Sequence, residues 1–151
     1  MATTAHGRTP VHLWIVGILS LLWSSMGAYD YSMTRMHNMA YLAKSMPGVD
    51  PNVGLAWLEG MPMYAQIGWG LGVWGALLGA ILLLVRSRYS VWAYAVSVLG
   101  MALSFGYQLG LAPPLPGADS AMYKIFPYVI IAVGIFMLCY SWSMEKKGVL
   151  R

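Results

Sequence analysis

The stretch from Met63 to Val85, MYAQIGWGLGVWGALLGAILLLV, contains no Asp, Glu, Lys or Arg. About 20 consecutive apolar residues are enough to cross the hydrocarbon core of a membrane as a helix. Residues 11–29, 89–111 and 122–142 share this character, and Lys124 lies near enough to a helix end for its ammonium group to reach the headgroups. We therefore predict an all-α membrane protein in which four transmembrane helices form one domain over residues 1–151.

The overall composition agrees with a lipid-facing surface. Hydrophobic residues make up 59% of the chain and charged residues 9%, whereas about a quarter of a soluble domain is charged. So few charges cannot cover the surface of a soluble protein of this size. The nine Lys and Arg residues are dispersed between the apolar segments, so we expect membrane lipids with anionic headgroups as partners, and no nucleic acid.

The first apolar segment has an alternative interpretation as a cleaved signal peptide. Its amino-terminal flank holds one fixed positive charge, Arg8, and the nearest exit of small residues places Met26 where a signal peptidase prefers a small side chain. Both observations favour a retained helix.

The distribution of basic residues predicts the orientation. Cytoplasmic connections of membrane proteins carry an excess of Lys and Arg. The amino-terminal flank, the second connection and the carboxyl tail hold six such residues (Arg8, Arg86, Arg88, Lys146, Lys147, Arg151), and the first and third connections hold three (Arg35, Lys44, Lys124). We expect a multi-pass protein of the bacterial inner membrane with both termini in the cytoplasm.

The first connection, residues 34–60, is too long for a simple linker. Apolar residues recur there at three- and four-residue spacing up to Pro47-Gly48, and Asp50-Pro51 then forms a favourable helix start. The spaced residues are Met36, Met39, Ala40, Ala43 and Met46. We predict two short helices in this outer loop that lie on the membrane surface or cap the bundle.

Glycines line one face of the second predicted span. They are Gly68, Gly72, Gly75 and Gly79. Because small residues let helix backbones approach closely in a membrane, we expect this face to pack against the first span, the third span or a partner subunit.

Polar residues near the outer ends of the spans form the best candidate site. These are Asp30, Gln66, Tyr107 and Gln108, which together would make a small polar cluster at an outer mouth. Asp30 could hold a cation or a proton, or pair with Arg35, or simply mark where the helix leaves the membrane. The glutamines could instead hydrogen-bond between helices.

No motif points to catalysis, a metal or a cofactor. His12 and His37 belong to opposite sides of the predicted membrane and His6 to the amino-terminal flank, so one copy offers no pair of haem ligands. Cys139 is the only cysteine, and the chain has no phosphate-binding loop, nucleophile elbow or zinc-binding motif. We expect no enzyme activity and no bound cofactor.

Several stretches resemble a known group of proteins. They are LWIVGILSLLW (13–23), GAYDY (27–31), Met33-Thr34, GVWG (72–75), Arg86 with Arg88, and GVLR (148–151). They resemble small four-span inner-membrane proteins of proteobacteria that are often labelled sugar transporters. The chain departs from that pattern at Ser24, where the group has Asn, and at His37-Asn38-Met39, where the group has Arg-Asn-Glu.

Two functions follow as hypotheses. The first is a non-catalytic structural or accessory subunit that packs within a homo-oligomer or a larger membrane complex. The alternative, which the resemblance also implies, is a small-solute transporter or channel component.

Overall fold

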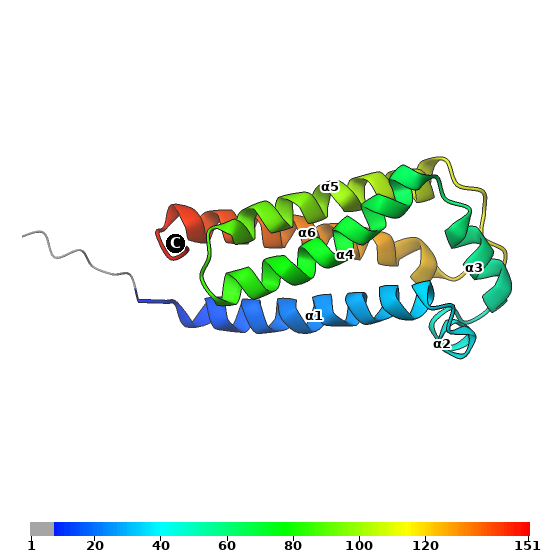
Figure 1. The fold of residues 1–151 in the computed structure, drawn as a ribbon, viewed down its shortest axis with the longest axis horizontal. Coiled ribbons are helices and arrows are strands. Elements are labelled where there is room, and N and C mark those ends of the chain that lie inside the picture. The colour runs from blue at the N-terminus through cyan, green and yellow to red at the C-terminus, as the bar shows by residue number, and fades with distance from the viewer. Residues whose placement is uncertain (1–7) are drawn as a thin grey trace, which may run out of the picture.

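The computed structural model describes residues 8–151, and within them the chain forms six helices and no strand. The long helices lie side by side, and the short ones lie at one end of the bundle (Figure 1). The helices are α1 (Val11–Arg35), α2 (Met39–Ser45), α3 (Pro51–Glu59), α4 (Met63–Leu84), α5 (Tyr89–Gly110) and α6 (Ala121–Lys146). The predicted all-α fold with two short helices in the first connection is confirmed. Because α1, α4, α5 and α6 are long and apolar enough to cross a membrane, the protein is a multi-pass membrane protein.

Two of the long helices extend beyond the predicted spans. α1 continues past Tyr29 to Arg35, and α6 continues to Lys146. In α1 the hydroxyls of Ser32 and Thr34 donate to backbone carbonyls four residues earlier, so these polar side chains are accommodated within the helix. The apolar run therefore marks the part of α1 that suits lipid, whereas backbone hydrogen bonding continues beyond it.

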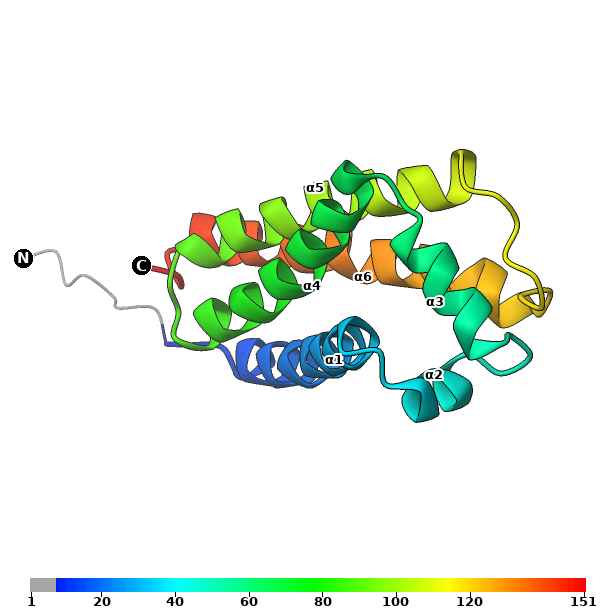
Figure 2. The same ribbon diagram turned by 45° about the vertical axis from the view of Figure 1, so that its right-hand side comes forward.

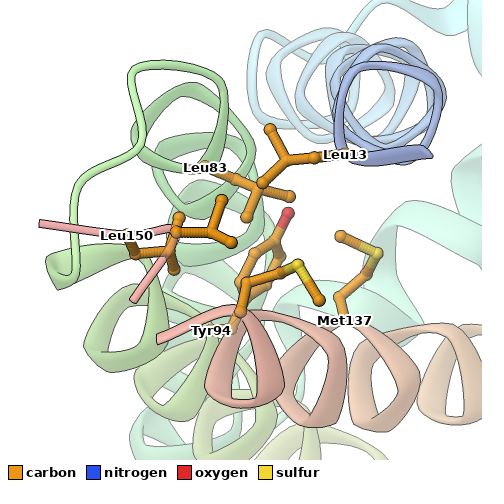
Figure 3. Close-up of a cluster of buried hydrophobic side chains, with 7 residues drawn as sticks. Leu13, Leu83, Tyr94, Met137 and Leu150 are labelled. Atoms are coloured by element: carbon orange, nitrogen blue, oxygen red, sulfur yellow. The ribbon is translucent and has the colours of Figure 1, made fainter. Parts of the chain in front are cut away.

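The bundle has two distinct ends. The cap end contains α2, α3 and the connection 111–120, and the hairpin end contains the α4–α5 turn with residues 8–10 and 147–151 (Figure 1). α4 lies between α1 and α5 in both ribbon views (Figures 1 and 2). The main buried cluster is at the hairpin end, where Leu13, Leu83, Tyr94, Met137 and Leu150 meet (Figure 3).

α4 and α5 pack closely because both present small residues to each other. A Cβ atom added to Gly68 would lie 2.6 Å from the carbonyl oxygen of Gly100, and one added to Gly100 would lie 2.5 Å from that of Gly68. Serine hydroxyls of α5 then reach across to α4: Ser90 donates to Gly79 O at 2.8 Å and Ser97 to Gly72 O at 2.6 Å. Helices in lipid associate through such close contacts and hydrogen bonds.

Tyr94 connects three helices. Its ring lies against Gly79 of α4, where an added Cβ would come within 3.0 Å of the ring carbons. Beyond that contact its hydroxyl forms a buried hydrogen bond of 2.7 Å with Ser20 of α1. A side chain at position 79 would block this path, so the glycine allows α5 to reach α1.

The cap is held together by contacts between the first and third connections. Trp57 Nε1 donates to Pro113 O at 2.7 Å, and the Tyr123 hydroxyl donates to Pro47 O at 3.0 Å. The backbones of Gly48 and Gly117 touch, and both residues have positive φ angles that favour glycine. Leu42, Val49 and Met61 are buried at this end, so the first connection is a packed cap.

Side chains set the starts of the two short helices. The Asp50 carboxylate accepts a hydrogen bond of 2.8 Å from Asn52 N, with Pro51 in the first turn, which confirms the predicted start of α3. Asn38 caps α2 in the same manner by accepting from Tyr41 N. The apolar stripe predicted for α2 is wrong in detail, because Leu42 is its buried residue whereas Ala40 and Ala43 are exposed.

Residues 148–151 fold back onto the α4–α5 turn. Arg151 N donates to Arg86 O at 2.7 Å, and Arg88 N donates to Arg151 O at 2.8 Å. Val149 and Leu150 are buried in the cluster described above. The carboxyl tail is thus part of the packed structure at the hairpin end.

Candidate functional site

Asp30 lies within α1 near the cap end and pairs with a tyrosine of α2. Its carboxylate accepts a hydrogen bond of 2.8 Å from the Tyr41 hydroxyl, and the Tyr41 ring meets the Tyr29 ring edge to face. Burial and the neighbouring Asp30 carboxylate raise the pKa of Tyr41 to about 12. The pair attaches α2 to α1, which gives Asp30 a role in holding the cap.

Arg35 is directed to Gln66 and not to Asp30. Its Nη1 donates to Gln66 Oε1 at 3.3 Å, and its guanidinium lies 5.9 Å from the centre of the Tyr31 ring. Gln66 also donates to the carbonyl oxygens of Met61 and Glu59, at 2.8 and 3.1 Å. Gln66 therefore links α1, α4 and the end of α3.

Gln108 stays on its own helix. Its amide donates to the Ser104 hydroxyl at 2.9 Å, one turn earlier in α5. Across residues 8–151, no hydrogen bond joins any two of Asp30, Gln66, Tyr107 and Gln108. The structure places these predicted site residues at one end of the bundle. Asp30, Gln66 and Gln108 each hydrogen-bond a separate partner, whereas the Tyr107 ring meets the Tyr64 ring edge to face.

Tyr107 lines a small cavity at the cap end. The cavity has a volume of about 140 Å³, and Ala56, Trp57 and Gly60 from the α3 segment line one side of it. Ala112 and Pro113 complete the lining, and the Trp57 indole is held in the cavity wall by its bond to Pro113. Pockets that enclose drug-sized ligands measure about 300–1,000 Å³, so this cavity suits at most a small molecule or water.

The described histidines form two unrelated contacts. His12 Nδ1 hydrogen-bonds the Tyr140 hydroxyl between α1 and α6 at the hairpin end, and His37 pairs with the Glu59 carboxylate at the cap end. His6 lies outside the described residues. In the part of the chain from residue 8 onward, no three His, Cys, Asp or Glu side chains gather into a potential metal site.

Gly68, Gly72, Gly75 and Gly79 all face α5. Added Cβ atoms at Gly72 and Gly75 would meet Met101 and Ser97, and those at the other two would meet Gly100 and Tyr94. Of the three alternatives open from the sequence, the third span is the neighbour of this face. The glycine face is therefore used inside the protomer.

Sequence reasoning missed the serines of α5. Ser90, Ser97 and Ser104 are buried and recur every seven residues on the face toward α4. The spacing was a usable signal, because small polar residues at a helical repeat favour close packing in a membrane. Within residues 8–151, every buried side-chain nitrogen or oxygen has a hydrogen-bond partner.

In comparisons with known proteins, no family model, curated protein or solved structure matches the chain.

Proposed function

We propose that the protein is a non-catalytic structural or accessory subunit of the bacterial inner membrane that associates through α6, either with a second copy or with another membrane protein. The observation that carries this proposal is the placement of α6 at the edge of the bundle. It packs along α5, and of its residues only Gly134, Met137, Ser141 and Met144 are buried.

The flanks of α6 are rich in large apolar side chains. The exposed large apolar residues of α6 include Met122, Ile125, Phe126, Tyr128, Val129, Ile135, Phe136 and Trp142. At the hairpin end α6 also reaches α1 through the buried cluster of Leu13 and Met137 and through the His12–Tyr140 bond, and nearer the cap end a tilted Trp23–Phe126 pair has ring centres 6.3 Å apart. A helix held mainly by one neighbour leaves both flanks available to another helix, which would gain van der Waals contact there.

The non-catalytic part of the proposal is supported by the interior. Ser90 and Ser97 bond the α4 backbone and Ser20 bonds Tyr94, so these membrane-embedded hydroxyls serve helix packing. Substrate or ion sites within membranes usually depend on ionisable groups that face the bundle interior. The described spans have none at mid-depth.

The orientation with both termini in the cytoplasm is part of the same proposal. The hairpin end carries six Lys and Arg residues against one acidic side chain, Glu145, whereas the cap end carries three against four acidic side chains. A positively charged end is retained in the cytoplasm during insertion.

Cys139 makes the association testable without adding a new residue. It is the single cysteine and is exposed on α6. Treatment of native membranes with a short bis-maleimide should convert the protein into a covalent dimer or an adduct with one other subunit. The matched control combines Cys139→Ser with Leu19→Cys, because Leu19 is 61% exposed on α1 and lies at a similar depth, about two turns from the hairpin end.

We expect an adduct from Cys139 and none from the control. The proposal is refuted when neither cysteine gives an adduct and the protein is a monomer without companions in mild detergent. Equal adducts from both positions would indicate random collision and would count against α6 as the surface.

A small-solute transporter is the second candidate, favoured by the cavity beside Trp57 and Tyr107. Aromatic side chains are suitable platforms for sugar rings, and the resemblance to proteins labelled sugar transporters points the same way. Uptake of labelled sugars into proteoliposomes, compared between the intact protein and Tyr107→Ala, tests the idea. Absence of flux from the intact protein removes it.

A further inference from the structure

Backbone pairing at the hairpin end gathers three arginines. Arg151 exchanges hydrogen bonds with Arg86 and Arg88 across the fold, at 2.7 and 2.8 Å. The tail cannot easily move away, because Val149 and Leu150 are buried beside it. The backbones of three arginines from two distant segments are thus fixed side by side.

These arginines have no acidic partner. Among residues 8–151 the one ion pair joins His37 to Glu59, at the opposite end of the molecule. Lys146 and Lys147 add two more positive charges next to the tail, and Glu145 is the single acidic side chain in that region. Like charges held together repel one another, and a bound anion removes the repulsion.

Arg86 occupies a position where glycine would be easier. α4 ends with Arg86 N bonded to Leu83 O and Ser87 N to Leu82 O, and Arg86 has a φ of +58°. α6 ends with the same pattern but uses Gly148, with φ +72°. The backbone at residue 86 is therefore strained, and glycine at this position would relieve the strain.

One donor of that guanidinium is already engaged. Arg86 Nη1 donates to Thr9 Oγ1 at 2.6 Å, which fixes the direction of the side chain. The remaining N–H groups of the planar fork have no partner from residue 8 to residue 151, and a guanidinium binds phosphate oxygens with paired donors.

Two aromatic rings indicate the level of these charges in the membrane. The Arg88 guanidinium lies 5.7 Å from the centre of the Tyr89 ring, and the Lys146 ammonium 3.9 Å from that of Trp142. Both rings are more than half exposed, at 59% and 52%. Exposed Tyr and Trp residues at helix ends sit among lipid headgroups, so the cations beside them lie at the depth of lipid phosphates.

We propose that the hairpin end is a binding site for the phosphate of an anionic phospholipid, held by Arg86, Arg88 and Arg151. Lys146 and Lys147 would strengthen the attraction from the side. The tail residues Val149 and Leu150 act as positioning residues, because they place Arg151 against the turn. Arg86, Arg88 and Arg151 lie outside α6, so binding by these three residues does not require association through that helix.

The test measures lipid binding to the purified full chain in mild detergent by native mass spectrometry. The probes are phosphatidylglycerol, phosphatidylcholine and inorganic phosphate. One variant changes Arg86, Arg88 and Arg151 to Gln, and the matched control changes the three cap-end cations Arg35, Lys44 and Lys124 to Gln. A basic residue near an anionic surface contributes roughly fivefold to binding, so we expect the first variant to bind phosphatidylglycerol about 100-fold more weakly and the control to bind like the intact protein.

Arg86→Gly separates loss of the site from loss of the fold. Glycine relieves the backbone strain, so we expect this variant to unfold no more easily than the intact protein and yet to bind phosphatidylglycerol about fivefold more weakly. Arg86→Lys should retain more of the binding than Arg86→Gly.

Three results would overturn the proposal. One is equal binding of phosphatidylcholine and phosphatidylglycerol by the intact protein. Another is unchanged binding in the triple-arginine variant. The third is full displacement of the lipid by inorganic phosphate at similar concentration, which would mark a site for free anions.

Discussion

Replacing Gly100 by alanine would push α4 and α5 apart. The new methyl carbon would lie 2.5 Å from Gly68 O, 2.7 Å from Gly72 N and 2.9 Å from Leu71 Cβ. The first two of these atoms belong to the backbone of α4, so no side-chain rotation can make room. Ordinary contacts of a methyl carbon begin at about 3.5 Å, so the helices must separate by close to 1 Å.

The cost of Gly100→Ala follows from that separation. Overpacking a close-packed interior costs about 1–3 kcal/mol. A separation of 1 Å would also stretch the 2.6 Å bond from Ser97 to Gly72 O beyond hydrogen-bonding distance, which adds about 0.6 kcal/mol. We expect the free energy of unfolding to fall by about 1.6–3.6 kcal/mol.

Gly106→Ala is the matched control. Gly106 lies in the same helix, and an added Cβ there meets nothing within 4 Å. The assay is reversible unfolding in mixed micelles with increasing SDS, followed by far-ultraviolet circular dichroism. The control should match or exceed the intact protein, because alanine favours helix. Equal stability of the two variants would refute the inferred closeness of α4 and α5.

Three further predictions concern single side chains. Ser97→Ala should lower the free energy of unfolding by about 0.6 kcal/mol in the same assay, because the hydrogen bond to Gly72 O is lost. A loss above about 1.7 kcal/mol would mean that the Ser97 side chain makes a further contribution to stability. Tyr41, with its pKa raised by burial and by Asp30, keeps its proton longer in the folded state, so its stabilisation is complete below pH 10 and declines as the pH rises from 10 to 12. Melting temperatures between pH 9 and 12 should decline less steeply in Tyr41→Phe, and an unchanged slope would contradict the assignment. Leu150→Ala should cost about 2 kcal/mol through the emptied core position, whereas no loss of stability would show that the tail is not packed.

The spans were predictable because lipid imposes a simple rule on sequence. A run of apolar residues of sufficient length marks each membrane crossing, and all four long helices start within one residue of the predicted positions. The ends were less predictable: α1 passes through Asp30 to Arg35 because backbone hydrogen bonds continue where the apolar run stops. The start of α3 was also predictable, since Asp50-Pro51 acts locally.

The candidate site was harder, because partners distant in the sequence decide it. Asp30 is explained by Tyr41, and Gln66 by the carbonyl groups at the end of α3. Neither pairing produces a repeating pattern of residues in the sequence. For the same reason the sequence did not decide which helix packs against the glycine face of α4, although the serines seven residues apart on α5 indicated α5. The pairing of Arg151 with the α4–α5 turn depends on the folded bundle and has no local precursor in the sequence.

The contacts that hold the cap also set an order of events during synthesis. The bond from Trp57 to Pro113 joins residues 56 positions apart, and the bond from Tyr123 to Pro47 joins residues 76 positions apart. α2 and α3 therefore leave the ribosome long before their partners exist. Their contacts with the third connection and α6 cannot form until α5 and the first residues of α6 have been synthesised. The cap therefore acquires its structure well after α2 and α3 have been synthesised, and a chain arrested before residue 113 would expose its uncovered surface to quality-control proteases.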